Sequence, residues 1–311
     1  MAFDDSIDFE LFRYTPSQIP AGIFAGLFLL TTAAHLYQVL KTKAWYFVPF
    51  VVGGAFQIIG YIVRIPTHDD KENVTLFSIQ AILILLAPPL YAASIYMVLG
   101  RLTTYLQAES LSVVRVKWMT KIFVAGDIVA FLMQAAGAGI MSAGTVENYD
   151  VGEKVTIGGL GVQLAFFGFF MITCALFHHR IRKSPTAAVS ILATSATVSP
   201  ESGRRSGISN ILSPSRNWES ILIGLYAASI LILVRSIFRL VEYIQGNDGY
   251  LISHEYFMYI FDSSLMFLTM VVLNAVHPGV VLGTGFKGGR KGEGDVEMSG
   301  ASSVVEGERQ R

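Results

Sequence analysis

Seven apolar stretches, each about 20 residues long, limit the fold of this 311-residue sequence more than any other feature. A bilayer core about 30 Å thick is crossed by a helix of roughly 20 apolar residues. The stretches lie at 18–40, 45–65, 77–99, 119–141, 156–178, 219–241 and 255–276. Only 15% of the residues are charged, whereas soluble domains have about 25%. The sequence therefore predicts an all-α bundle of seven transmembrane helices.

The basic residues of the connecting segments lie mostly on one side of the predicted bundle. Alternate connectors, beginning after the first span, carry Lys41, Lys43, Arg101, Arg115, Lys117, Arg180, Arg182, Lys183, Arg204, Arg205, Arg216, Lys287, Arg290 and Lys291. The opposite side has only Arg13, Lys71 and Lys154. Connectors rich in lysine and arginine stay in the cytosol. We therefore expect the N-terminus outside and the C-terminus in the cytosol, an arrangement that requires an odd number of spans.

The predicted transmembrane domain covers residues 18–278 and includes one long loop, and a further segment lies on each side of it. Residues 1–17 begin with acidic side chains rather than with the basic start of a secretory signal, so we expect an extracellular segment without a cleaved leader. Residues 184–217 are rich in serine and threonine, which predicts a flexible cytosolic loop, and residues 279–311 predict a disordered cytosolic tail. Asn73-Val74-Thr75 is a glycosylation sequon, but its closeness to the third span argues against its use.

Ionisable side chains within the spans need an explanation, because each costs about 2.5–3.5 kcal/mol at mid-bilayer. A rise of about 1.5 Å per residue converts sequence position into depth. By this measure a polar cluster lies in the outer half of the bundle, where we expect substrate binding or translocation. Its members are Gln80, Gln163, Arg235, Arg239, Glu242, Glu255 and Asp262. The simpler alternative is that the amides only join helices and that Glu242 and Glu255 contact water at the helix ends.

A second polar layer is predicted in the inner half of the bundle, formed by His35, Asp127 and Gln134. We expect His35 to be the partner of Asp127, since the two lie at similar depth, and the pair is a candidate proton site. Gln57 falls between the two layers. Arg64 is predicted to extend its side chain to the membrane surface.

Prolines and glycines within the spans predict positions at which helices bend or approach one another closely. Pro88 and Pro89 lie in the middle of the third span, where each proline removes a backbone donor, so we expect a kink and a candidate gate there. Glycines predict close approach of helices at Gly22 and Gly26 in the first span and at Gly137 and Gly139 in the fourth. Packing alone accounts equally well for most of the glycines.

Several motifs in a fixed order resemble the fungal lipid-translocating exporters, also called RTA-like proteins. They are YTP at Tyr14–Pro16, QAILILLAPPLYAASIYMVLGRL at Gln80–Leu102, QAAGAG at Gln134–Gly139, GGLGVQ at Gly158–Gln163, RSIFRLVEYIQGNDGYLISHEYFMYIFD at Arg235–Asp262 and NAVHPG at Asn274–Gly279. The resemblance covers residues 14–279. It implies a seven-helix plasma-membrane protein that exports or flips sphingoid long-chain bases and confers resistance to toxic amphiphiles. It assigns no binding residues, so the site residues rest on the depth argument.

Membrane lipids and amphipathic small molecules are therefore the expected partners, and nothing in the zero net charge points to nucleic acid. We expect no enzymatic activity and no cofactor, since the phosphate-binding loop of ATPases is absent from the sequence. The acids of the outer cluster are candidates to hold the amine of a long-chain base. The sequence does not indicate an oligomeric state.

Two other functions remain open. A seven-helix sensor, or a regulator of lipid transport, would share the expected topology, but the lone Cys174 cannot form the disulfide common in receptors of that kind. An intramembrane lipid hydrolase would need about three histidines around zinc. The six histidines are scattered over both sides of the predicted bundle, which disfavours the hydrolase.

Overall fold

The computed structural model describes residues 14–71, 73–141, 146–190, 218–246 and 249–282. Among these residues it has no strand, and seven helices are long and apolar enough to cross a membrane, which confirms the predicted all-α class. The long helices are α1 (Gln18–Thr42), α2 (Val48–Arg64), α3 (Val74–Tyr105), α4 (Val116–Met141), α5 (Val146–Lys183), α8 (Trp218–Ile244) and α10 (Ser264–Ala275). Before α10 come α9 (Glu255–Met258) and the π-helical segment η4 (Tyr259–Ser263), which together with α10 form the seventh span.

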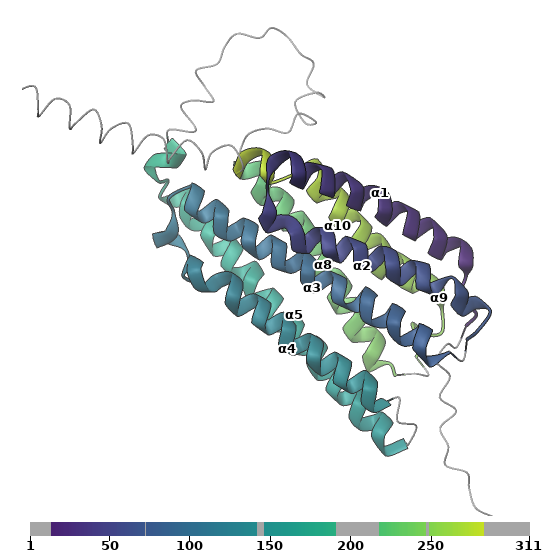
Figure 1. The fold of residues 1–311 in the computed structure, drawn as a ribbon. Helices are drawn as coiled ribbons and strands as arrows, with labels where there is room; N and C mark the ends of the chain where they lie inside the picture. The colour runs from purple at the N-terminus through teal and green to yellow at the C-terminus, as the bar shows by residue number, and fades with distance from the viewer. Residues whose placement is uncertain (1–13, 72, 142–145, 191–217, 247–248, 283–311) are drawn as a thin grey trace, which may run out of the picture.

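The helices form a closed ring in chain order (Figure 1). Each packs on the next, from α1 on α2 through to α8 on α10, and α10 returns to α1. A contact between α3 and α8 crosses the ring. The pair α4 and α5 forms one side of the bundle, and α1 and α2 form the other.

The two ends of the bundle differ in charge. We call the end at which α1 begins the N-terminal end, and the opposite end the basic end. Among the described residues, the basic end has Lys41, Lys43, Arg115, Lys117 and Lys183 at or near the ends of α1, α4 and α5. Lysine and arginine are enriched at the cytosolic ends of transmembrane helices, so the basic end is the one expected to face the cytosol.

Several helices extend beyond the stretches that hydropathy marks. The α3 helix runs from Val74 because the Asn73 side chain accepts a hydrogen bond from the Leu76 N–H at 3.2 Å, as N-cap residues do. Asn73 Nδ2 also donates to Asp70 Oδ2, so the sequon asparagine has a structural role. Pro88 and Pro89 lie inside α3, which continues through them as one helix.

The predicted loop and tail fall mostly outside the described residues. Residues 187–190 are helical, and Thr186 Oγ1 donates to the Leu106 carbonyl at 2.6 Å. Residues 191–217 and 283–311 lie outside the described residues, as do residues 1–13. Residues 279–282 form a helical turn in which Val281 and Leu282 are buried, so the ordered bundle reaches beyond the boundary predicted at 278.

Candidate functional site

The most buried ion pair among the described residues joins Arg235 of α8 to Asp262 of η4. Arg235 donates from Nε to Asp262 Oδ1 at 2.5 Å and from Nη2 to Oδ2 at 3.3 Å, and both side chains are at most 2% exposed. A two-bond arginine–carboxylate pair satisfies both charges in a medium without water. The pair therefore ties α8 to the seventh span within the bundle.

The π-helical turn around Asp262 has a local cause. Ser263 Oγ donates to the Met258 carbonyl and Ser264 Oγ to the Tyr259 carbonyl, each five residues earlier. Hydroxyls that bond back to the chain favour such a widened turn, and π-helical turns recur at functional sites. Ser263 also shares a hydrogen bond with the Tyr61 hydroxyl of α2. The turn thus orients Asp262 and is itself held by α2.

A second ion pair lies one helical turn further along α8. Arg239 Nη1 donates to Glu242 Oε2 at 2.7 Å, and the guanidinium lies 5.4 Å from the centre of the Tyr243 ring. Glu242 is buried, so the alternative that it sits in water at a helix end is wrong. Pairing with Arg239 offsets the cost of burying the carboxylate.

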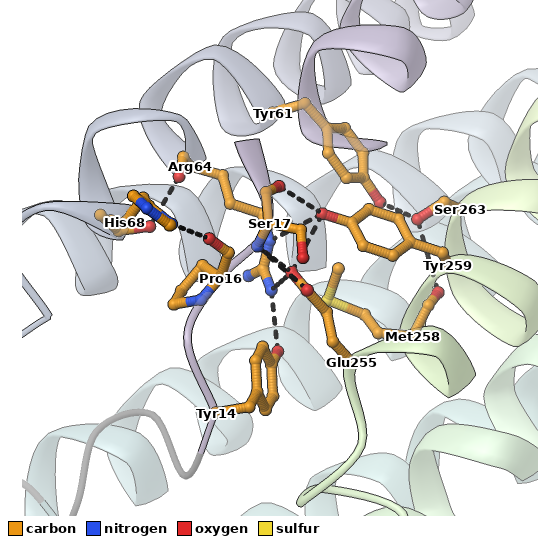
Figure 2. Close-up of polar contacts among 11 residues, drawn as sticks. Tyr14, Pro16, Ser17, Tyr61, Arg64, His68, Glu255, Met258, Tyr259 and Ser263 are labelled. Carbon is orange, nitrogen blue, oxygen red and sulfur yellow. Dashed lines mark hydrogen bonds and ion pairs between the residues drawn. The ribbon is translucent and has the colours of Figure 1, made fainter. Parts of the chain in front are cut away.

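The third ion pair corrects the prediction for Arg64 (Figure 2). Arg64 is only 3% exposed and does not reach toward a membrane surface. Its Nη2 donates to Glu255 Oε1 at 2.9 Å and to the Tyr14 hydroxyl at 2.8 Å, while Nε lies 3.3 Å from the Tyr259 hydroxyl. The sequence placed Arg64 at the end of a span, and the N-terminal segment that covers it could not be predicted from hydropathy.

The segment Tyr14–Ser17 crosses the N-terminal end of the bundle as an extended strap (Figure 2). The Ser17 N–H donates to both Glu255 carboxylate oxygens, at 2.9 and 3.0 Å, and His68 Nδ1 lies 2.8 Å from the Pro16 carbonyl. Burial raises the pKa of the Tyr14 phenol, although Arg64 opposes the shift, so the phenol stays protonated. The strap is held by these polar contacts together with the burial of Pro16.

These groups surround a pocket of about 130 Å³ at the N-terminal end. Its wall combines charged and polar side chains with apolar ones: Tyr14, Arg64, Phe77, Gln80, Ala81, Ile84, Arg239, Glu242, Tyr243, Leu251, Ile252, His254, Met258 and Asp262. A water molecule needs about 10–15 Å³ of such space, so the pocket has room for a small polar head group.

Two polar atoms of this pocket wall have no hydrogen-bond partner among the described residues. They are Gln80 Oε1, on a side chain that is 3% exposed, and Arg239 Nε. The first is an acceptor and the second a donor. A buried polar group left unsatisfied costs about 1–3 kcal/mol, and both atoms lie beneath the pocket surface, so a ligand reaches them only if neighbouring side chains shift.

The structure brings together most but not all of the predicted outer cluster. Gln80, Arg239, Glu242 and Asp262 line the pocket, Arg235 pairs with Asp262, and Glu255 pairs with Arg64. Gln163 does not line the pocket. Its Oε1 accepts a hydrogen bond from Gln134 Nε2 at 3.0 Å, which joins α5 to α4.

The inner layer does not form a single site, and the predicted contact between His35 and Asp127 is wrong. Asp127 accepts a hydrogen bond from the Tyr96 hydroxyl at 3.0 Å, between α4 and α3. His35 Nε2 lies 3.0 Å from the Met270 carbonyl, between α1 and α10. Position along a helix does not determine which faces meet. Among the described residues, no group of three or more His, Cys, Asp or Glu side chains is arranged to hold a metal ion.

Comparison with known proteins supports the motif resemblance. The sequence profile described as "RTA1 like protein" matches residues 50–285, which include α2 to α10 and most of the pocket wall. The chain belongs to the RTA1-like family.

Relatives within the RTA1-like family align over most of the chain. Protein RTM1 of Saccharomyces cerevisiae is 34% identical over 304 residues, covering 85% of this chain and 90% of its own length. Protoporphyrin uptake protein 1 of the same species is 33% identical over 302 residues, covering 86% and 91%. Sphingoid long-chain base transporter RSB1, also from S. cerevisiae, is 28% identical over 257 residues, covering 79% and 67%. No solved structure matches the chain.

Proposed function

We propose that this RTA1-like protein moves lipids or other amphipathic compounds across the membrane, and that the pocket at the N-terminal end holds their polar head group. The observation that carries the proposal is a buried pocket wall with three ion pairs and two unpaired polar atoms at one end of a seven-helix bundle. A purely structural polar cluster would satisfy its own groups.

Sphingoid long-chain bases are the substrate class that fits this chemistry best. Their ammonium and hydroxyl groups can donate to Gln80 Oε1 and Glu242, and a hydroxyl can accept from Arg239 Nε. The three arginines and three acids of the ion pairs balance in charge, so the ammonium of a long-chain base adds one positive charge, which the pocket-lining carboxylates of Glu242 and Asp262 partly offset. The relative named as a sphingoid long-chain base transporter supports this assignment.

In this proposal the pocket holds the head group, and the alkyl chain of the long-chain base extends from it into the bilayer. Helices α1 and α8 expose large apolar side chains, including Leu30, Ile223 and Ile244, against which a tail can pack in the bilayer. We propose that the N-terminus lies outside, because the basic residues gather at the opposite end. We propose the plasma membrane as the location, as the resemblance to lipid-translocating exporters implies. In that orientation the pocket faces the outer leaflet. No enzymatic activity is proposed.

Transbilayer movement in liposomes tests the proposal. Purified protein is reconstituted, and the movement of a fluorescent long-chain base is followed for wild type, Gln80→Leu and Asp262→Asn, with Gln163→Leu as the control at an amide outside the pocket. We expect faster movement than in protein-free vesicles, slowed by the two pocket variants and not by the control. If wild type adds nothing, with or without a proton gradient, direct transport is wrong and the chain is a sensor or regulator.

A further inference from the structure

Among the described residues that line the pocket, His254 is the only histidine. It lies on the segment 249–254, which joins α8 to α9 at the N-terminal end and is outside the membrane-spanning helices. It forms no ion pair with any other described residue, whereas the arginines and acids of the pocket wall all belong to ion pairs. Histidine is the side chain that changes charge between pH 5 and 8. His254 is therefore the wall residue that can change the charge of the pocket.

A hydrogen bond to the backbone fixes which nitrogen of His254 carries the proton. Nδ1 lies 2.9 Å from the Tyr250 carbonyl oxygen, which can only accept a hydrogen bond. Nδ1 is therefore the donor, and in the neutral ring Nε2 keeps a free lone pair. A second proton is added at Nε2 and leaves the bond to Tyr250 in place. Acidification thus changes the charge of the pocket wall without releasing the ring from the backbone.

Aromatic neighbours hold the imidazole at the pocket. The centre of the Tyr250 ring lies 4.3 Å from that of His254, and those of Tyr256 and Phe257 lie at 5.6 and 6.4 Å. The Tyr250 and Tyr256 hydroxyls are hydrogen-bonded to each other at 3.2 Å. These contacts involve rings that stay neutral over the range in which histidine titrates, so they persist when the imidazole gains a proton.

The other charged groups of the site balance one another. Each of its three carboxylates, Glu242 of α8, Glu255 of α9 and Asp262 of η4, is paired with an arginine. The wall residues that α3 contributes are uncharged. The remaining titratable groups are phenols, which as a class ionise near pH 10: Tyr14 of the strap, Tyr243 of α8, Tyr250 beside His254 and Tyr256 of α9.

We propose that His254 selects head groups by their charge: the pocket accepts the ammonium of a long-chain base while His254 is neutral and excludes it once His254 is protonated. This inference rests on the proposed function of the pocket. Because the ion pairs sum to zero, a bound ammonium is the one net charge of the filled pocket when the imidazole is neutral. A protonated imidazole adds a second positive charge within a space of about 130 Å³, where like charges repel enough to weaken binding about tenfold.

The ligand keeps its own charge over the same range. The amine of a long-chain base, like that of lysine, is protonated throughout pH 5–8. Binding is therefore strong above the pH at which His254 gains its proton and is lost as the pH falls through it. In the proposed orientation the pocket faces the outer leaflet, so an acidic outer medium favours release of the head group on that side.

Binding to the purified full-length chain in detergent tests this role of His254. The affinity for sphinganine, a long-chain base, is measured at about pH 7.5 and about pH 5.5. N-acetylsphinganine, which has the same chain without the charge, is the control ligand. We expect the wild type to bind sphinganine about tenfold more weakly at the lower pH and to bind N-acetylsphinganine equally at both.

Two histidine variants assign the pH dependence to a residue. His254→Asn keeps an N–H that can donate to the Tyr250 carbonyl but cannot take up a charge, so its binding of sphinganine is expected to be equal at the two pH values. His68→Asn is the matched control, at a histidine of the same end that does not line the pocket, and it keeps the wild-type pH dependence.

The outcomes separate this inference from the proposed function. Equal wild-type affinity for sphinganine at the two pH values, or a pH dependence that persists in His254→Asn, would overturn the role of His254 and leave the pocket as the head-group site. No binding at about pH 7.5 would contradict the pocket itself, and the inference with it. If His254→Asn does not fold, the two ligands decide with the wild type alone: a pH dependence shared by N-acetylsphinganine would overturn the inference.

Discussion

At the scale of single residues, the pair of Arg235 and Asp262 contributes most to holding the candidate site together. Asp262→Asn leaves the Arg235 guanidinium buried without a counter-charge, so we expect a loss of about 3–5 kcal/mol in stability, seen as a lower Tm of the purified protein. The double variant Arg235→Met/Asp262→Leu removes both charges and should be more stable than Asp262→Asn. If the double variant lost as much stability as the single variants Arg235→Met and Asp262→Leu together, the two residues would not be coupled.

The pocket can be tested by comparing a substitution at Gln80 with the same substitution at Gln163 as the control. Both are buried amides, but only Gln80 lines the pocket, where its Oε1 is unpaired. We expect Gln80→Leu to weaken the binding of a long-chain base about two- to tenfold, through the loss of one hydrogen bond. Gln163→Leu loses only a contact with Gln134, so binding stays the same while Tm falls slightly. The affinity for the long-chain base is measured in detergent. If it changes equally in the two variants, the pocket is not the binding site.

Residue type and position along the helices predicted which polar side chains lie near one another at the N-terminal end better than they predicted how those side chains pair. The motif Arg235–Asp262 contains four residues of α8 and η4 that line the pocket or form ion pairs: Arg235, Arg239, Glu242 and Asp262. The partners of Arg64, His35 and Asp127 could not be found, because each depends on how its helix is rotated toward a neighbour. The contact of Tyr14 with Arg64 was also missed, since a tyrosine ahead of the first span has no apolar or charge pattern that indicates its partner.

At the scale of helices, α4 and α5 approach each other closely at Gly137. An added Cβ there would overlap Thr156 Oγ1 and lie 2.5 Å from the Gly152 carbonyl oxygen, whereas one at Gly139 would meet nothing within 4 Å. We expect Gly137→Ala to destabilise the bundle by about 1–3 kcal/mol and Gly139→Ala to leave Tm unchanged. Similar Tm values for the two variants would contradict the packing of α4 on α5.

The Tyr14–Ser17 strap depends on one carboxylate. Glu255→Gln removes the charge that accepts from the Ser17 N–H and pairs with Arg64, so we expect backbone amide exchange over residues 14–20 to become about tenfold faster. Hydrogen exchange followed by mass spectrometry measures this, with residues 120–135 of α4 as the internal control. A strap that exchanges at the wild-type rate would show that Glu255 does not hold it.

Hydropathy alone was enough to predict the seven helices, but not how they end or bend. Apolar runs mark the part of each helix that crosses the bilayer, whereas caps such as Asn73 extend α3 beyond it. The π-helical turn at Asp262 arises from hydroxyls five residues after the carbonyls that they contact, a pattern that hydropathy does not register. Gly22 and Gly26 were expected to bring helices close together, but a Cβ added at either position would meet no atom of the described bundle within 4 Å.

At the scale of the whole molecule, the ring of seven helices separates two polar regions. The pocket lies at the N-terminal end among α2, α3, α8 and η4, and the second region, which includes His35, Asn274 and His277, lies between α1 and the seventh span toward the basic end. The seventh span carries Asp262 of the first region and Asn274 and His277 of the second. A movement of this span would therefore change both regions together, as alternating access to a transport site requires.

The most direct test of the pocket as the head-group site is photo-crosslinking in membranes. A long-chain base with a photoreactive group next to its amine is irradiated with the wild-type protein, and the labelled peptides are mapped by mass spectrometry. We predict labels at the pocket wall, near Phe77, Leu251 and Met258, that disappear when unlabelled long-chain base competes. Labels that spread over the outer surface of α4 and α5, and that resist competition, would contradict the account.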